Sequence, residues 1–106
     1  MDPKHTFIGT DIDWDTVHPE KIIIESGVRL TARTCILTHF INPQTGSFES
    51  GEVRIKKNAF IGTGTIITKP VTIGERTIVG AGSIVTKNIP DDEVWAGNPA
   101  KFIRKR

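Results

Sequence analysis

A six-residue spacing of aliphatic side chains runs through most of this 106-residue chain. Ile or Val recurs at every sixth position from Ile55 to Val85, and the same spacing links Ile24, Leu30 and Ile36. Six is a multiple of the two-residue strand repeat and a poor fit to the 3.6-residue helical turn, so these side chains fall on one face of short strands. The period therefore predicts repeated β-strands and excludes helix as the main element.

Two further positions of the repeat support this interpretation. Small or β-branched residues follow each aliphatic by four positions and fit a second inward slot: Val28, Thr34, Ala59, Thr65, Val71, Thr77, Ser83 and Ile89. Residues that tolerate positive φ often follow by three positions and predict a tight corner: Gly27, Asn58, Gly64, Gly82 and Asn88. Short sides joined by regular corners predict a parallel β-solenoid whose coils pair through their backbones, in one all-β domain over residues 1–106.

The repeat is interrupted once, between Ile36 and Ile55. The intervening sequence FINPQTGSFESGE has turn residues and no six-residue pattern, which predicts a loop leaving the coil over about residues 40–52. His39 stands directly before this loop, where other repeats have a corner, so we expect its side chain to point outward. An imidazole is largely neutral at pH 7 and suits proton transfer there.

Composition and charge narrow the classes of function. The net charge is +2, and a small basic cluster at the C-terminus holds Lys101, Arg104, Lys105 and Arg106. It lacks the breadth and interleaved aromatics of a nucleic-acid face, which leaves a solvated end or a site for coenzyme phosphates. The sequence shows neither a membrane-spanning apolar run nor a signal peptide, so we expect a cytoplasmic protein without a membrane partner. The single cysteine, Cys35, lies within the repeat and is expected to be structural.

The runs IGTGTI, ITKPVT, IGERTI and VGAGSI resemble the hexapeptide repeat of left-handed parallel β-helix acyltransferases, over about Ile8 to Arg106. GAGSIVTKNIP and WAGNPAKFIRKR resemble the closing coil and the C-terminal segment, about residues 90–106, of galactoside, maltose, serine and xenobiotic acetyltransferases. The resemblance implies a left-handed helix of about three to four triangular coils. It also implies acetyl-CoA as co-substrate, no metal, and a homotrimer with its sites between subunits.

The resemblance assigns roles to particular residues. His39 matches the general base, and Thr63 matches the position whose backbone N–H supports the oxyanion, although that position is often serine. The matched coenzyme A residues are Ala81, Thr86, Lys87, Lys101 and Arg104. The acidic segment DIDWDTVHPEK matches the region facing the acceptor, so Asp15 and His18 are expected to contact a sugar or a similar small molecule.

Several alternatives stay open. The same base could serve an amino-sugar nitrogen in place of a hydroxyl, and a solenoid of this kind could be a non-catalytic module. A zinc enzyme like the gamma-class carbonic anhydrases would need a pair of histidines within one coil, which the spacing of His5, His18 and His39 does not supply. The helical segment that several relatives carry before the solenoid is missing, so the chain could be either a minimal enzyme or a truncated one.

Overall fold

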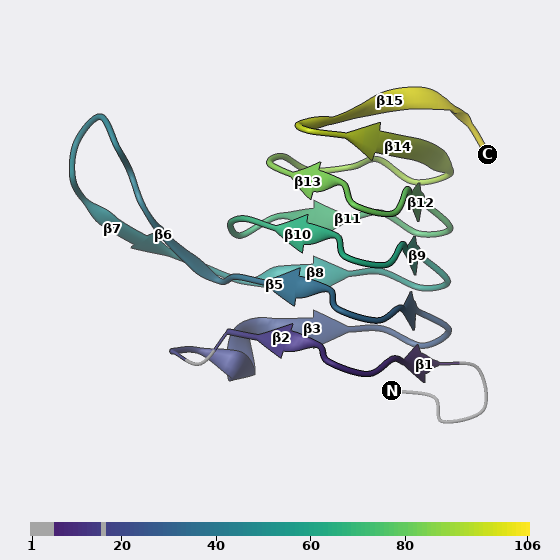
Figure 1. Ribbon diagram of the computed structural model, residues 1–106, viewed down its shortest axis with the longest axis horizontal. Helices are drawn as coiled ribbons and strands as arrows, with labels where there is room; N and C mark the ends of the chain where they lie inside the picture. The colour runs from purple at the N-terminus through teal and green to yellow at the C-terminus, as the bar shows by residue number, and fades with distance from the viewer. Residues whose placement is uncertain (1–5, 16) are drawn as a thin grey trace.

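The computed structural model describes residues 6–15 and 17–106, and His5 lies outside them. Fifteen short strands and one 3-10 turn make up the regular structure (Figure 1). They are β1 (Phe7–Ile8), β2 (Asp13–Trp14), η1 (Pro19–Lys21), β3 (Ile22–Ile24), β4 (Arg29–Leu30), β5 (Cys35–Ile36), β6 (His39–Ile41), β7 (Phe48–Ser50), β8 (Val53–Ile55), β9 (Phe60–Ile61), β10 (Ile66–Ile67), β11 (Thr72–Ile73), β12 (Ile78–Val79), β13 (Ile84–Val85), β14 (Glu93–Gly97) and β15 (Ala100–Lys105). Within this part of the chain, no helix is long and apolar enough to cross a bilayer.

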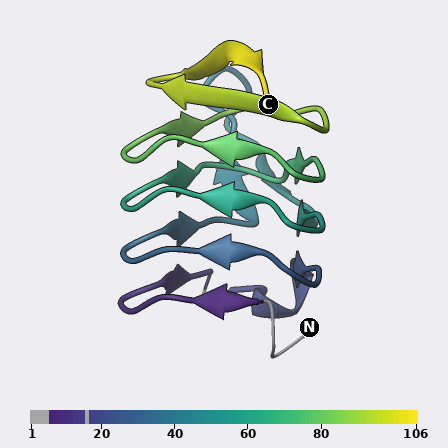
Figure 2. The ribbon, with the colours of Figure 1, turned by 90° about the vertical axis from the view of Figure 1, so that its right-hand side faces the viewer.

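The strands form three parallel sheets that we call A, B and C. Sheet A has the order β1-β4-β9-β12-β14-β15, sheet B the order β13-β10-β5-β2, and sheet C the order β11-β8-β3. Apart from the β6–β7 insertion, the chain passes from A to B to C and back to A, so three consecutive strands make one coil (Figures 1 and 2). In the last coil an isolated bridge between Ile89 and Ile73 takes the place of the strand in sheet C. Within sheets A, B and C all pairings are parallel except β14–β15, which confirms the predicted parallel solenoid.

The core is the column of predicted inward side chains. The aliphatics from Leu30 to Val79 are fully buried, and Val85 is 1% exposed. In the second slot, hydroxyls donate to the carbonyl three residues earlier, as from Thr65 to Gly62 (2.7 Å) and from Ser83 to Gly80 (2.6 Å). A buried hydroxyl is costly unless it is bonded, so these local bonds explain why Thr and Ser fit beside Ile and Val.

The corners follow the predicted pattern with three differences. Gly27, Asn58, Gly64 and Gly82 adopt positive φ as expected, and so do Arg33, with φ 60°, and Arg76, with φ 56°. Arg76 tolerates this strain in a corner where its guanidinium bonds Asp92 (2.6 and 2.9 Å). Asn88 is not among the residues with positive φ. Its amide oxygen instead accepts the N–H of Thr72 on the coil below (2.8 Å), so this residue serves coil stacking.

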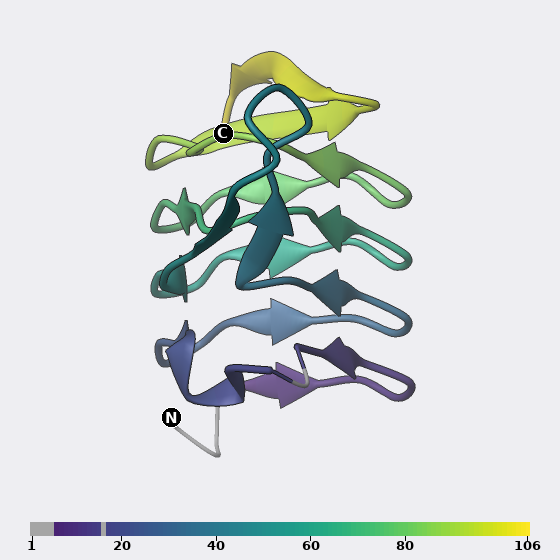
Figure 3. The ribbon, with the colours of Figure 1, turned by 90° about the vertical axis from the view of Figure 1, so that its left-hand side faces the viewer.

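The predicted loop is an ordered hairpin. Strands β6 and β7 pair antiparallel and project from the corner between sheets B and C toward the C-terminal end (Figures 1 and 3). Its turn is built on Asn42, whose carbonyl accepts the N–H of Gly46 (2.7 Å) and whose side chain accepts that of Gln44 (2.9 Å). The six-residue period cannot predict this hairpin, because the strands of the hairpin lie outside the coil.

The C-terminal segment folds back over the last coil. Strand β15 pairs antiparallel with β14 at the end of sheet A, as Figure 1 shows in yellow. Trp95 of β14 is 7% exposed, and its indole N–H donates to Glu93 (2.8 Å). This aromatic ring closes the core at that end.

Candidate functional site

His39 and Asp15 meet at the corner between sheets B and C. Asp15 directly follows β2, and Thr38 and His39 follow β5, which pairs with β2 one coil higher. The imidazole Nδ1 lies 2.7 Å from Asp15 Oδ2. The same oxygen accepts the backbone N–H of Thr38 (2.6 Å) and its hydroxyl (2.8 Å). Coil stacking therefore places a carboxylate beneath the histidine at the base of the hairpin.

The carboxylate of Asp15 is held in its charged form. It is 1% exposed, and burial by itself would raise its pKa. Hydrogen bonds from the backbone and hydroxyl of Thr38, and from the backbone N–H groups of His18 and Val17, outweigh burial and bring the pKa well below the usual range of an aspartate. An ionised Asp15 only accepts hydrogen bonds, so the proton between the two residues belongs to His39 Nδ1.

This arrangement leaves Nε2 as the ring nitrogen that can accept a proton. His39 is 27% exposed, and its ring stacks on Phe48 of β7 with centroids 5.3 Å apart. The Asp15 carboxylate bound to Nδ1 fixes the tautomer of His39, and the stacked ring of Phe48 helps to fix the orientation of the imidazole. The exposed nitrogen is equipped to accept a proton from a molecule bound at this corner.

Asp15 contacts His39 directly, whereas no hydrogen bond within the described residues joins the side chains of His18 and His39. Asp15 is buried, and its two oxygens accept hydrogen bonds from protein groups, so its expected contact with an acceptor stays a prediction. His18 lies beside η1 with Nδ1 3.2 Å from Glu20 Oε1. It donates its backbone N–H to Asp15 (3.1 Å), and its side chain is 35% exposed.

The matched coenzyme residues lie in three places on one chain. Thr63 and Ala81 occupy the corner between sheets A and B on neighbouring coils, where Gly82 donates to the carbonyl of Thr63 (2.8 Å). Thr86 and Lys87 follow β13 at the corner between sheets B and C, the corner that also carries His39. Lys101 and Arg104 are exposed on β15. A single chain thus carries the residues matched to the coenzyme at the A–B corner, at the B–C corner and on β15.

Two details of these residues bear on ligand binding. Within the described residues the backbone N–H of Thr63 donates to no backbone oxygen, although its hydroxyl contacts that of Thr31 (3.3 Å). The ammonium of Lys87 lies 5.4 Å from the ring centroid of Trp95, which orients it by a cation–π contact.

Sequence reasoning missed two residues that surround His39 and Asp15, namely Thr38 and Phe48. The pairing of Trp14 with Ile36 puts Asp15 one residue before Thr38 in the stacked register, so aligning Trp14 with the repeat could have paired Asp15 with this corner. Phe48 lies in the interruption, where no period indicates a partner.

Comparison with known proteins gives a consistent result. Residues 52–87 match the family model of the bacterial transferase hexapeptide, six repeats. No curated protein matches the sequence significantly. Among solved structures, a mutant of AntD, an N-acyltransferase from Bacillus cereus, in complex with dTDP and coenzyme A, is 26% identical with a TM-score of 0.83. The match covers 95% of this chain and 60% of that one.

Two further structures are similar. A maltose O-acetyltransferase from Clostridium difficile 630 is 28% identical with a TM-score of 0.67, over 96% of this chain and 71% of that chain. A galactoside acetyltransferase in complex with coenzyme A has a TM-score of 0.69 at 24% identity, over 95% and 64%, and supports the fold. The chain spans 52% and 60% of the length of two AntD structures. The solenoid is accordingly the left-handed parallel β-helix that the resemblance implied.

Proposed function

We propose that this chain, whose repeats and fold are those of the hexapeptide-repeat acyltransferases, moves an acetyl group from acetyl-CoA to a hydroxyl of a sugar or similar small acceptor. The observation that carries the proposal is the buried Asp15 carboxylate bound to Nδ1 of His39, with Nε2 left as the base. Coenzyme A is present in the AntD and galactoside acetyltransferase structures, which supports acetyl-CoA as the donor.

In the proposed reaction, Nε2 of His39 accepts the hydroxyl proton as the acceptor oxygen attacks the thioester carbonyl. Asp15 stabilises the imidazolium that forms, because its negative charge lies 2.7 Å from Nδ1. The backbone N–H of Thr63 supports the negative oxygen of the tetrahedral intermediate. When the carbon–sulfur bond breaks, His39 returns its proton to the leaving thiolate, and the ester product and coenzyme A are released.

The coenzyme residues fit a site shared by copies of the chain. Thr63 and Ala81 lie at one corner beside sheet B, and His39, Thr86 and Lys87 lie at the other. A homotrimer that joins unlike corners would bring the oxyanion donor of one copy to the base of another. The exposed cations Lys101 and Arg104 would then meet the phosphates of the coenzyme.

The experiment combines acetyl-CoA binding by calorimetry with thiol release in the presence of sugar acceptors. His39→Ala should lower kcat by about 10²- to 10⁴-fold while acetyl-CoA still binds. Asp15→Asn should lower kcat and alter its pH profile, because a side-chain amide can present its NH₂ to Nδ1 and move the ring proton to Nε2. Asp91→Asn, the same change on an exposed corner that carries none of the site residues, is the matched control. Unchanged turnover in a folded His39→Ala protein would show that the base has been misassigned.

A second candidate is transfer to an amino group. The likeness to AntD, described as an N-acyltransferase, is the observation that favours it. A neutral amine and a hydroxyl can use the same base, so the assay should offer matched sugars that differ only in that group. Faster turnover of the amino sugar would replace the O-acetyl assignment.

A further inference from the structure

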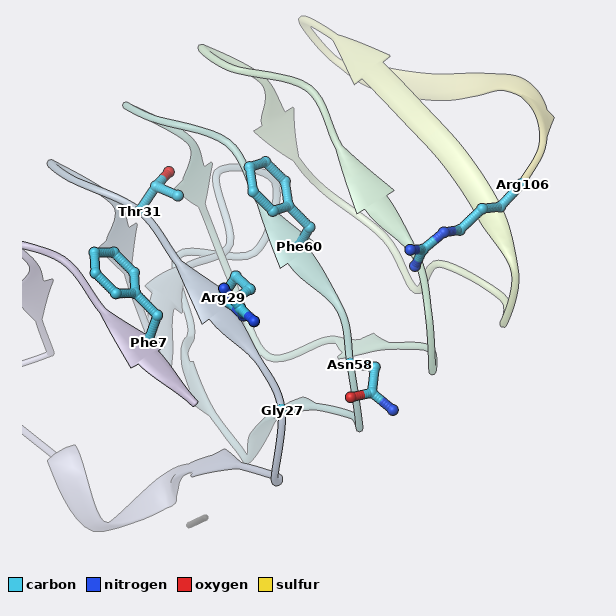
Figure 4. A pocket seen from close by; sticks show the side chains of 7 residues that line it. All are labelled: Phe7, Gly27, Arg29, Thr31, Asn58, Phe60 and Arg106. Atoms are coloured by element: carbon cyan, nitrogen blue, oxygen red, sulfur yellow. The ribbon is translucent and has the colours of Figure 1, made fainter. Parts of the chain in front are cut away.

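A groove of about 540 Å³ lies on the outer face of sheet A, away from His39 and beside the Thr63–Ala81 corner, since the hydroxyl of its Thr31 lies 3.3 Å from that of Thr63. His39 lies at the corner between sheets B and C, so sheet A is the opposite side of the triangular coil. Phe7, Arg29 and Phe60 line the groove from neighbouring strands, in direct register from β1 to β4 to β9 (Figure 4). None of the expected site residues lines it.

The rings in this groove are unusually open to solvent. Phe7 is 52% exposed and Phe60 is 42% exposed, although both belong to the regular coils. In a parallel sheet, neighbouring strands are about 4.8 Å apart, so the two rings stand about 10 Å apart with Arg29 on the strand between them. A flat ring system placed there would cover apolar surface that water now contacts.

The polar part of the groove is cationic. Arg29 and Arg106 are the charged residues of its lining, and Thr31 and Asn58 supply a hydroxyl and an amide. Across the described residues, the ion pairs found do not include Arg29. The guanidinium of Arg106 is anchored because it donates to the carbonyl of Arg76 (2.9 Å). A planar guanidinium without a carboxylate partner matches a phosphate through two parallel hydrogen bonds.

We propose that this groove binds a nucleotide-like anion, a planar ring system carrying a phosphate, with the ring against Phe7 or Phe60 and the phosphate on Arg29. The proposal does not require acyl transfer, because none of the residues assigned to that reaction lines the groove, although the groove adjoins Thr63 through Thr31 and includes Arg106 of the C-terminal basic cluster. Two sources carry this chemistry: a free nucleotide or nucleotide-linked molecule, and the nucleotide end of coenzyme A itself.

Titration calorimetry with thymidine monophosphate, thymidine and inorganic phosphate tests the proposal on the full chain. Thymidine monophosphate should bind in a saturable manner and more tightly than either part alone. Arg29→Gln should weaken it about tenfold or more, and Phe60→Ala by about tenfold, the scale of one charged hydrogen-bond pair or one stacked base. Arg29→Lys keeps the charge and should lose less, and Arg33→Gln, exposed on the next corner, is the matched control. Melting curves should show that every variant is folded.

Repeating the titration with saturating coenzyme A separates the two sources. Unchanged binding of thymidine monophosphate would assign the groove to a separate nucleotide, and one-for-one displacement would assign it to the coenzyme. The proposal is overturned if the folded protein shows no saturable binding, or if Arg29→Gln binds as tightly as Arg33→Gln. It is also overturned if Phe60→Ala changes the oligomeric mass while thymidine monophosphate does not bind, because the groove would then be a contact between copies.

Discussion

Asp15 ties the stability of the fold to pH through a single carboxylate. Hydrogen bonds from Thr38, His18 and Val17 lower the pKa of Asp15 in the folded state, against the effect of burial. An aspartate in the unfolded chain has a pKa of about 3.9. Below that pH the unfolded chain binds the proton first. The contribution of Asp15 to the free energy of unfolding is therefore present above about pH 4 and lost as the pH falls further.

We expect urea unfolding to give a steeper loss of stability between about pH 5 and pH 2.5 for the unmodified chain than for Asp15→Asn. The variant should also be less stable at pH 7, because an amide cannot satisfy all the donors that converge on the carboxylate. Asp91→Asn, on an exposed corner, controls for the general effect of removing a carboxylate. Parallel pH profiles for Asp15→Asn and the unmodified chain would contradict this account.

At the scale of the coil, glycines fill two distinct needs. A Cβ on Gly62 would clash with the backbone of Ala81 on the next coil, within a distance that real contacts do not reach. Gly64, on the same corner, has φ +73° and open space around its Cα. The first glycine permits close stacking of coils, and the second permits the bend.

Gly62→Ala and Gly64→Ala form a matched pair for thermal unfolding. Gly64→Ala should cost about 1–2 kcal/mol for a left-handed alanine, and it should leave coil stacking intact. Gly62→Ala should cost more, because backbone atoms of two coils must separate, and it should also weaken acetyl-CoA binding at the adjoining Thr63–Ala81 corner. Equal melting temperatures for the two variants would mean that separating the coils costs no more than one left-handed alanine, which would contradict the clash argument.

The sequence correctly predicted the residues whose positions obey the six-residue period. Inward positions such as Ile61 and Thr65 are fixed by burial in every coil, so periodicity finds them without knowledge of their partners. The β6–β7 hairpin and the stacking of Phe48 on His39 depend on contacts outside the coil, and Asp15 acquires its role only from the coil above. The resemblance assigned a role to His39, but the carboxylate that sets its tautomer became visible only in three dimensions.

In the whole molecule, the outer faces of sheets B and C differ in polarity. Cys35, Ile66 and Ile84 align in register on the outer face of sheet B. The matching positions of sheet C include Arg54, which pairs with Glu25 and Glu52, and Thr72. A stripe of aligned apolar side chains is more easily desolvated than one of ion-paired groups, so sheet B is the better face for packing copies together.

Packing of copies through sheet B would also explain why the residues of the proposed site lie on two different corners of one chain. Three copies arranged around their B sheets would each turn the Thr63–Ala81 corner toward the His39 corner of a neighbour.

Ile66→Asp places a charge at the centre of that contact, where it would be buried without a partner. Light scattering should then show a trimer for the unmodified chain and a monomer for Ile66→Asp, and the monomer should lose acetyl-CoA binding because neither corner is complete alone. Thr72→Asp, the outward position of sheet C on the same coil, should change neither property. A monomeric Ile66→Asp protein that still binds acetyl-CoA would show that one chain suffices for the coenzyme.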